Sequence, residues 1–324
     1  MVRFLLATFL CVSTVEGNST ATGLTKHHFS EPHLGTVVHL VFYSKSKESA
    51  AELAKQCFQR VVELDAVLSD YQSNSELSKL CKKQIGEPHQ VSDDLFTVLD
   101  QAQKISSLTD GAFDITIGNH SKRWRERKPG AQSDDSNFRS LVLVHQKKTV
   151  TLLKPLTIDL GGIGKGYIAD QLMLLLNKAG VKHAAVNIGG ETVLADAPPG
   201  KQGWKIGIEN PEHEIIGTLE LSNTAISTSG DSFQFFENNG KRQSHLIDPA
   251  TKKSKANRLN VTTIAPTSMQ ADAWATALRI LPTEKALSIA NQQKPLEALF
   301  IPYRQARVHS KNFPNITESA GNDK

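Results

Sequence analysis

The predicted strands and helices of this 324-residue chain do not alternate regularly, and this irregular order limits the fold more than any other feature. Strands or hairpins are predicted at 36–44, 140–153, 157–160, 183–188, 204–208, 217–221, 260–265 and around Asn238-Asn239-Gly240. Helices are predicted at 48–70, 93–109, 167–180 and 270–280. A parallel sheet needs repeated strand–helix–strand units, so we expect a mixed α+β fold with mostly antiparallel sheets and flanking helices.

Helix boundaries are also visible in the sequence. The segment 48–70 carries apolar residues at steps of three and four, which is typical of a helix packed on a core. Ser92 is a suitable N-cap for the helix at 93–109, and Gly111 follows its end. Ser73-Asn74-Ser75-Glu76 has the pattern of a capping box that opens a short helix.

The composition is that of an ordinary globular protein, with 39% hydrophobic and 22% charged residues, so a large core can form. The net charge of +4 is a small excess, and no long basic stripe with interleaved aromatic residues occurs. We therefore expect no nucleic-acid partner, while an anionic substrate is compatible with this charge.

The first 17 residues are predicted to be a signal peptide. Arg3 precedes an apolar run at 4–12 that is too short to span a bilayer, and polar residues follow at once. A buried first strand or helix is the alternative. Lipid attachment at Cys11 is a second alternative, disfavoured because the residue before it, Leu10, is not small. If the segment is removed, Cys57 and Cys81 remain, either paired or as separate thiols.

A glycine-rich segment, Asp159-Leu160-Gly161-Gly162-Ile163-Gly164-Lys165-Gly166-Tyr167, lies between a predicted strand and a helix. Glycine backbone N–H groups and a helix N-terminus favour anions such as phosphates, and Lys165 adds a positive charge. The spacing fits neither the P-loop nor the dinucleotide-binding fingerprint. A tight structural turn with a surface lysine is the alternative.

Two further features could support catalysis. Asp272 and Thr276 lie one turn apart on a predicted helix, where their oxygens can share a hard cation such as Mg²⁺. The alternative is an ordinary first-turn aspartate and a threonine bonded back to the backbone. His245 lies at a strand end and could act as a general base, or could be a structural histidine.

Several short motifs carry little information alone but, taken in order, resemble the FAD:protein FMN transferase family, the ApbE family of flavin transferases. They include Gly111-Ala112-Phe113-Asp114, the glycine-rich segment, Asn187-Ile188-Gly189-Gly190, Thr228-Ser229-Gly230-Asp231, Ser244-His245-Leu246-Ile247-Asp248-Pro249 and Ala271-Asp272-Ala273-Trp274-Ala275-Thr276. The resemblance covers roughly residues 32 to 302.

The resemblance implies a T-fold-like architecture that forms a single domain at 30–310, followed by a polar tail at 311–324 that we expect to fray. It implies that Mg²⁺ is held by Asp272, Thr276 and the backbone oxygen of Gly162, and that His245 is the general base. It also implies FAD contacts from Leu34, Tyr71, Ala112, Phe113, Asp114, Asp159, Lys165 and Leu246.

The implied activity is the Mg²⁺-dependent transfer of FMN from FAD to a Thr or Ser hydroxyl, with a phosphoester bond formed and AMP released. The implied acceptor is a flavoprotein subunit of a membrane redox complex, and the implied location is the periplasm or the outer face of the inner membrane. Two alternatives are a Mg²⁺-dependent FAD pyrophosphatase and a non-catalytic extracytoplasmic flavin-binding protein.

The chain also departs from the family pattern. Gly164 stands where Ala is common, Ile115 where Pro is usual, and Glu191 where Asp is usual. The stretch 119–138 is highly charged, lacks the usual apolar pattern and is the best candidate for a domain boundary. The expected metal and phosphate ends match the family best.

Overall fold

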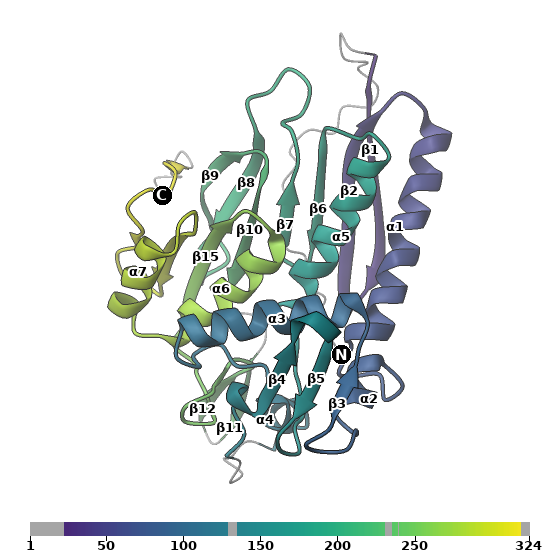
Figure 1. Cartoon of the computed structure of the whole chain (residues 1–324). Coiled ribbons are helices and arrows are strands. Elements are labelled where there is room, and N and C mark those ends of the chain that lie inside the picture. Colours follow the sequence, from purple (N-terminus) through teal and green to yellow (C-terminus); the bar gives the residue numbers. More distant parts are fainter. Residues whose placement is uncertain (1–22, 129–134, 231–234, 239, 319–324) are drawn as a thin grey trace.

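A computed structural model describes residues 23–128, 135–230, 235–238 and 240–318 (Figure 1). Its main feature is an eight-stranded sheet in which every neighbouring pair is antiparallel, as predicted. In spatial order the strands are β1 (Thr25–His33), β2 (Thr36–Ser44), β6 (Ala184–Ile188), β7 (Glu191–Leu194), β10 (Thr224–Ser229), β15 (Leu259–Ala265), β16 (Glu297–Pro302) and β17 (Val308–His309).

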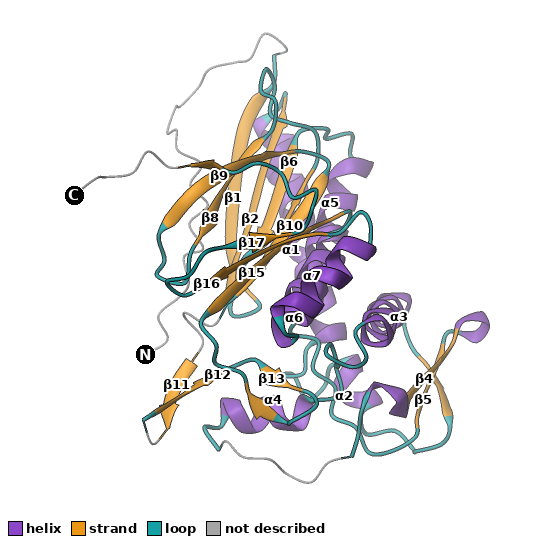
Figure 2. Cartoon of the chain, turned by 90° about the vertical axis from the view of Figure 1, so that its left-hand side faces the viewer, coloured by secondary structure: helices purple, strands orange, loops and turns teal. Residues whose placement is uncertain are grey.

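Helices cover one face of this sheet, and a second, smaller sheet covers the other (Figure 2). The helices are α1 (Lys47–Leu68), α5 (Gly164–Lys178) and α6 (Ser268–Ile280). The smaller sheet consists of β8 (Trp204–Glu209), β9 (Ile215–Leu221) and β18 (Thr317–Glu318), in the order β18-β9-β8. The main sheet is therefore the middle layer of three.

Strand alternation divides the core into two parts. In β2, Val38, Leu40 and Phe42 belong to the cluster under the helices, whereas Val41 belongs to the cluster under β8 and β9. All seven residues of β15 are buried, because both faces of that strand are covered. Burial on both sides also explains why polar residues of β15, such as Asn260 and Thr262, are buried instead of facing solvent.

The remaining elements gather mainly below the main sheet in the view of Figure 1. They are α2 (Glu76–Leu80), α3 (Asp93–Leu108), α4 (Gly118–Arg125), a sheet of β3 (Pro88–Gln90), β5 (Thr149–Leu152) and β4 (Leu141–Val144), and the hairpins β11 (Phe235–Asn238) with β12 (Lys241–Ser244) and β13 (Ile247–Asp248) with β14 (Lys253–Ser254). Helix α7 (Thr283–Gln292) instead packs against α6 and β16, at the left in Figure 1. Two 3₁₀ turns cover Phe138–Ser140 and His145–Lys147. The predicted N-cap Ser92 is confirmed, since its hydroxyl accepts a hydrogen bond from the Leu95 amide at 3.3 Å.

The predicted capping box is wrong in its register. Ser75, not Ser73, is the N-cap of α2, and its hydroxyl accepts a hydrogen bond from the Ser78 amide at 3.0 Å. Glu76 instead accepts a bond from the Ser92 amide at 2.6 Å, so it joins α2 to the start of α3. The Glu76 carboxylate therefore bonds the distant Ser92 amide and not the nearby Ser73 amide that a capping box would use.

The predicted fraying from residue 311 is also wrong for the residues described there. Phe313 is buried in the cluster under β8 and β9, and β18 pairs with β9. The buried ring of Phe313 and the backbone pairing of β18 together hold this polar segment against the smaller sheet.

Other sequence predictions have different outcomes. The predicted signal peptide and Cys11 lie outside the described residues. Cys57 and Cys81 are separate free thiols, and Cys57 is buried. No helix in the described ranges is long and apolar enough to cross a membrane.

Candidate functional site

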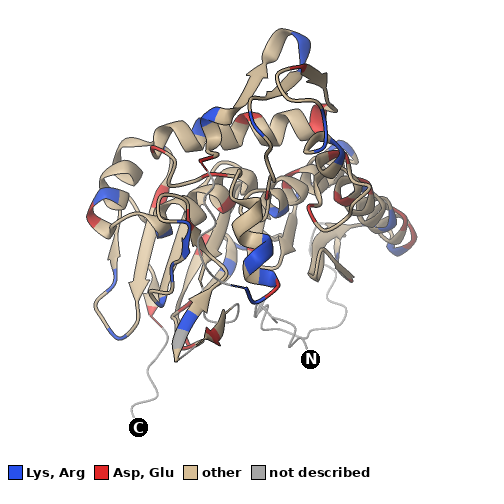
Figure 3. Ribbon diagram, turned by 90° about the horizontal axis from the view of Figure 1, so that it is seen from below, with Lys and Arg blue, Asp and Glu red and all other residues tan. Residues whose placement is uncertain are grey.

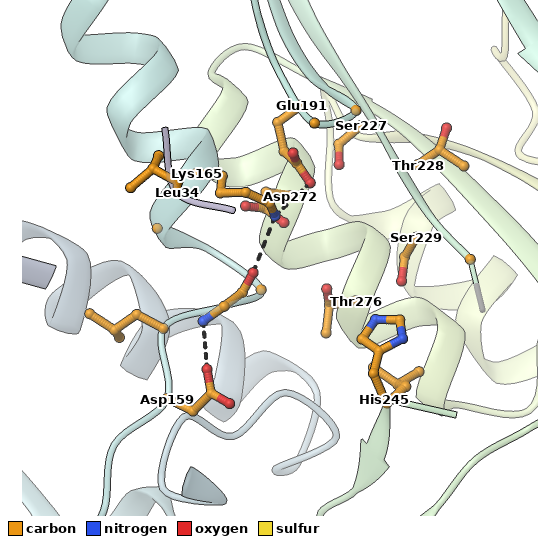
Figure 4. A pocket seen from close by; sticks show the side chains of 18 of the residues that line it. Leu34, Asp159, Lys165, Glu191, Ser227, Thr228, Ser229, His245, Asp272 and Thr276 are labelled. Atoms are coloured by element: carbon orange, nitrogen blue, oxygen red, sulfur yellow. Dashed lines mark hydrogen bonds and ion pairs between the residues drawn. The ribbon is translucent and has the colours of Figure 1, made fainter. Parts of the chain in front are cut away.

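A cleft of about 800 Å³ opens where the glycine-rich segment, α6 and the loops of the lower region meet. All of the predicted site residues line it: Leu34, Tyr71, Ala112, Phe113, Asp114, Asp159, Gly162, Lys165, His245, Leu246, Asp272 and Thr276. They come from segments far apart in the sequence. In Figure 4, Lys165, Glu191 and Asp272 gather above the glycine-rich turn, and Thr276 lies between them and the His245 ring.

One end of the cleft, here called the crossing end, is formed where α5 crosses α6. It comprises Gly161–Gly166, Glu191, Asp272 and Thr276. The turn is closed by Asp159, whose Oδ1 accepts the Gly161 amide at 2.7 Å. Aspartate commonly closes turns in this way. The turn leads directly into α5, and its amides are largely used within the chain: the Gly164 amide donates to the Leu160 carbonyl at 2.7 Å.

Glycine at two positions makes the helix crossing possible. A Cβ on Gly166 would lie 2.2 Å from the Ser268 carbonyl oxygen, and one on Gly162 would lie 2.9 Å from Thr276 Oγ1. The Gly166 amide donates to Asp272 Oδ2 at 3.1 Å. In return, Asp170 on α5 accepts the Ser268 and Met269 amides at 2.7 and 2.9 Å, which caps the start of α6.

At the crossing end, Asp272 and Glu191 are buried, and Lys165 is partly exposed. Lys165 Nζ lies 2.9 Å from Glu191 Oε1. Burial opposes the charged form of Lys165, but the carboxylates of Asp272 and Glu191 outweigh burial and raise its pKa. Burial raises the pKa of Glu191 to about 7, against the lowering effect of Lys165. Burial likewise raises the pKa of Asp272. Because Lys165 keeps its charge, an anion bound beside it would meet a positive group.

The oxygens at this end fit a hard cation. Gly162 lies directly against Thr276, and Asp272 is on the same face of α6 one turn earlier. Among the described residues the Thr276 hydroxyl has no bond back to its helix, unlike Thr109, whose hydroxyl bonds Ile105 O at 2.8 Å. Buried Glu191 Oε2 also lacks a hydrogen-bond partner within the described chain. Carboxylate, hydroxyl and carbonyl oxygens are the ligands that Mg²⁺ prefers.

No group of three His, Cys, Asp or Glu side chains suited to a metal is found in the parts of the chain that the structure describes. A cation here would therefore depend on the hydroxyl and the backbone carbonyl as well as the carboxylate. Such a mixed oxygen set disfavours zinc and matches a cation that retains some of its water.

The other end of the cleft, here called the aromatic end, contains Tyr71, Gly111–Asp114, Trp124, Arg125 and His245. The Arg125 guanidinium lies 4.3 Å from the centre of the Tyr71 ring and bonds Asp70 Oδ2 at 2.5 Å. Tyr71 is 76% exposed. Burial and the nearby Asp159 raise the pKa of Asp70, while Arg125 opposes that rise. An exposed ring held by a cation is suited to stacking with a flat ligand.

Asp114 lines the cleft, but its carboxylate is already used within the chain. Its Oδ1 accepts the Thr116 amide and hydroxyl at 2.8 and 2.7 Å, and its Oδ2 accepts the Phe138 amide at 2.9 Å. Burial raises the pKa of Asp114 despite these bonds. Asp114 therefore fixes the loop that carries Ala112 and Phe113 and orders the wall of the cleft.

His245 lies between β12 and β13, with the Trp124 ring edge-on at 6.1 Å. Trp124 is held in turn by a hydrogen bond from its Nε1 to the Gln243 carbonyl at 3.2 Å. The Leu246 amide donates to Ser244 Oγ at 3.1 Å, and the Leu246 carbonyl accepts from the Lys255 amide at 2.8 Å. These bonds fix the backbone next to His245. A ligand could contact Leu246 through its side chain or through the second lone pair of its carbonyl oxygen.

Leu34 reaches the cleft from the tight turn between β1 and β2. Leu34 and Gly35 have φ angles of 55° and 70°, so both adopt the left-handed conformation of a two-residue hairpin turn. This conformation is uncommon for leucine. The turn projects the Leu34 side chain toward the crossing end (Figure 4).

Sequence reasoning missed Trp124 and Arg125. Both lie on α4, inside the charged stretch 119–138 that was interpreted as a possible boundary. In the structure, Ser121, Trp124 and Arg125 of α4 line the cleft. The sequence did contain one indication of a binding role, because Trp124 next to Arg125 is the one large aromatic residue among the charged residues of α4. Glu191 was noted only as a departure from the family, and it is the ion-pair partner of Lys165.

Charges at the lower end of the molecule are mixed. Viewed from below, Lys and Arg segments lie beside Asp and Glu segments (Figure 3). Arg60 with Asp94 at 2.7 Å and Arg125 with Asp70 at 2.5 Å are examples.

Comparison with known proteins agrees with this geometry. The chain is 30% identical over 309 residues to the FAD:protein FMN transferase of Salmonella typhimurium, covering 89% of this chain and 88% of that protein. It is 31% identical over 279 residues to the Vibrio cholerae protein of the same name, covering 81% and 84%.

Solved structures give the same result. The flavin transferase ApbE from Vibrio cholerae matches with a TM-score of 0.77 and 26% identity, covering 89% of this chain and 98% of that one. The Pseudomonas stutzeri flavinyl transferase ApbE in its apo form matches with a TM-score of 0.79 and 25% identity, covering 89% and 95%. The model of the ApbE family matches residues 34–300, and the chain belongs to the ApbE family.

Proposed function

We propose that this enzyme transfers the FMN part of FAD to a Thr or Ser hydroxyl of another protein, forming a phosphoester bond and releasing AMP. The observation that carries the proposal is the convergence of three chemically distinct groups on one cleft. Lys165, the Asp272–Thr276 pair and His245 come from three separate segments and line the same cavity. These are the groups that cleavage of a pyrophosphate by a weak nucleophile requires.

The reaction balances with the groups present. The acceptor oxygen forms a bond to the FMN phosphorus, and the bond from that phosphorus to the bridging oxygen breaks. His245 takes the hydroxyl proton, and the electron pair of the broken bond leaves on AMP. Lys165, fixed beside Glu191 at 2.9 Å, stabilises the negative charge that develops on phosphate oxygens.

Asp272, Thr276 and the Gly162 carbonyl would hold Mg²⁺. When bound, the cation supplies neutralisation of charge on the phosphate oxygens. The chain supports this site by fixing Asp272 through the Gly166 amide and by placing Gly162 against Thr276. The aromatic end is the place for the flavin ring, beside Tyr71 and Arg125.

We further propose that the enzyme is exported and modifies a flavoprotein subunit of a membrane redox complex. The apolar segment at 4–12 after Arg3 supports export to the periplasm or the outer face of the inner membrane. A lipid on Cys11 would anchor the enzyme there, and mass spectrometry of the mature N-terminus distinguishes cleavage from lipid attachment.

The test follows AMP release and acceptor mass together. The chain from residue 18 onward is incubated with FAD and Mg²⁺, with and without the flavin-carrying domain of a redox-complex subunit. AMP together with an FMN-sized gain in acceptor mass is expected, and both disappear in Asp272→Ala. AMP without labelling would indicate a pyrophosphatase, in which water replaces the hydroxyl. Bound but intact FAD under both conditions would indicate a flavin-binding protein.

A further inference from the structure

The cleft continues past the predicted FAD-contacting residues into the space between the two sheets. This inter-sheet lobe is bounded by the face of the main sheet that points away from the helices, and by β8. Its lining consists of Asn187, Thr192, Ile226, Thr228 and Asn260 on the main sheet and Lys205–Glu209 on β8. None of the twelve predicted site residues lies here, so the lobe offers room for a second occupant beside the proposed substrate FAD.

The lobe is polar where the rest of the inter-sheet space is apolar. Further along the same face, Val41, Ala185 and Leu194 form a closed hydrophobic cluster with β8 and β9. In the lobe, Asn187 and Asn260 replace such residues although both side chains are at least 95% buried. Buried amides are normally bonded, yet Asn260 Oδ1 has no partner among the described residues. A buried acceptor without a partner indicates a missing donor.

β8 presents an open strand edge to this lobe. In the order β18-β9-β8, its one strand partner among the described residues is β9. The Glu209 carbonyl points away from β9, because it accepts Asn260 Nδ2 at 3.1 Å. N–H and C=O groups alternate in direction along an antiparallel strand, so those of Gly207 and Lys205 also point to the open edge. The register shift beside Glu209 does not disturb this alternation, since the extra residue, Ile216, is on β9.

From these observations we propose that the acceptor polypeptide binds in the inter-sheet lobe as an added strand along β8. An extended segment would satisfy the free N–H and C=O groups of Lys205 and Gly207 and the Asn260 acceptor. The lobe is continuous with the cleft. The Thr or Ser of the bound acceptor segment could therefore pass the Gly189–Gly190 turn and reach Lys165 and His245. This proposal rests on the transferase function and specifies how the partner is held.

The first test compares Lys205→Pro with Lys205→Ala. Proline removes the N–H that faces the open edge and is tolerated on edge strands, whereas alanine keeps the N–H and removes only the ammonium group. The acceptor domain labelled in the assay above is the probe. Its KM should rise about 3- to 10-fold more with Pro than with Ala, as expected for one lost hydrogen bond. The dissociation constant of FAD should not differ between them. Equal KM values in the two variants overturn the proposal.

Two measurements on the unaltered chain cover the case in which Lys205→Pro fails to fold. Hydrogen exchange of the Lys205 and Gly207 amides should slow when acceptor is added to the FAD-bound enzyme. Slowing by FAD alone would assign the lobe to FAD and overturn the proposal. Successive backbone amides of the acceptor segment can be N-methylated one at a time. Methylation should raise KM at every second residue, because alternate amides face β8. An equal effect at all positions would exclude strand pairing.

The two proposals can fail separately. A wild-type chain that labels no acceptor overturns both. A wild-type chain that labels the acceptor without protection of the β8 amides overturns only the strand-addition proposal.

Discussion

The two ends of the cleft are built differently. The crossing end is formed by two packed helices whose backbones approach so closely that Gly166 has no room for a side chain. The aromatic end is formed by loops and the short helix α4, with Tyr71 largely exposed and held by Arg125. The first end is rigid by packing, and the second is ordered by hydrogen bonds and ring contacts. The difference matches the proposed roles: fixed charges for the phosphates at the crossing end, a wall open to a flat ring at the aromatic end, and His245 next to Thr276 where the two meet (Figure 4).

Substitution of Asp272 should have the largest effect at the crossing end. Asp272→Ala removes the only side-chain carboxylate of the proposed Mg²⁺ site, so turnover should be lost. AMP release across a Mg²⁺ titration measures this. Glu284→Ala, which removes an exposed carboxylate on α7, is the control and should remain active. Normal turnover by Asp272→Ala at low Mg²⁺ would refute the metal assignment.

Substitution of His245 should have the next largest effect and tests the aromatic end. His245→Ala should retain FAD binding and lose transfer by about 10²–10⁴-fold, which is the usual contribution of a general base. Single-turnover labelling of the acceptor separates this loss from binding. The control is His145→Ala, which removes an exposed histidine paired with Asp100 on the other side of the lower region. Transfer at the wild-type rate would remove His245 from the mechanism.

Two glycines on the same helix provide a matched test of packing. Gly166→Ala places a Cβ 2.2 Å from the Ser268 carbonyl oxygen and should lower the free energy of unfolding by at least about 2–3 kcal/mol. Gly164→Ala meets only Leu160 Cβ at 3.7 Å. It should be neutral or stabilising by up to about 1 kcal/mol. Urea denaturation measures both. Similar values for the two variants would show that the helices can separate at little cost.

The smallest effect is expected from Arg125→Lys. Lysine keeps the charge beside Asp70 but loses the flat group over the Tyr71 ring, so the dissociation constant of FAD should rise about 3- to 10-fold. Fluorescence titration with FAD measures the change. Lys122→Ala on the exposed side of α4 should leave binding unchanged. A loss as large as that of His245→Ala would mean that the aromatic end is as tightly constrained as the crossing end.

The sequence predicts the crossing end better than the aromatic end, for physical reasons. The crossing end depends on short motifs, because the glycine-rich turn and the Asp272–Thr276 spacing each encode local geometry. The aromatic end depends on contacts between distant segments, such as Trp124 with Gln243. Periodicity in one sequence indicates local structure, so it cannot show that two residues far apart in the chain are in contact.

Strand prediction shows the same limit. β2 and β15 are recognisable because their apolar side chains are buried, and the predicted helices at 48–70 and 93–109 are confirmed within two residues. β1 was not predicted, since its sequence is polar and contains Pro32. It is an edge strand, where proline is tolerated and one side is exposed. The order of strands in the main sheet likewise depends on packing that no local motif encodes.

The reciprocal bonds between α5 and α6 have a consequence for the catalytic cycle. Gly166 donates to Asp272 on α6, and Asp170 on α5 accepts two amides from the start of α6. Separating these helices would break all three bonds and expose packed core, so we expect the crossing end to stay closed during turnover. Entry of the dinucleotide and departure of the nucleotide product therefore fall to the side of Tyr71 and Arg125. The nucleotides and the proposed acceptor polypeptide would thus use different openings, with the polypeptide entering through the inter-sheet lobe beside β8.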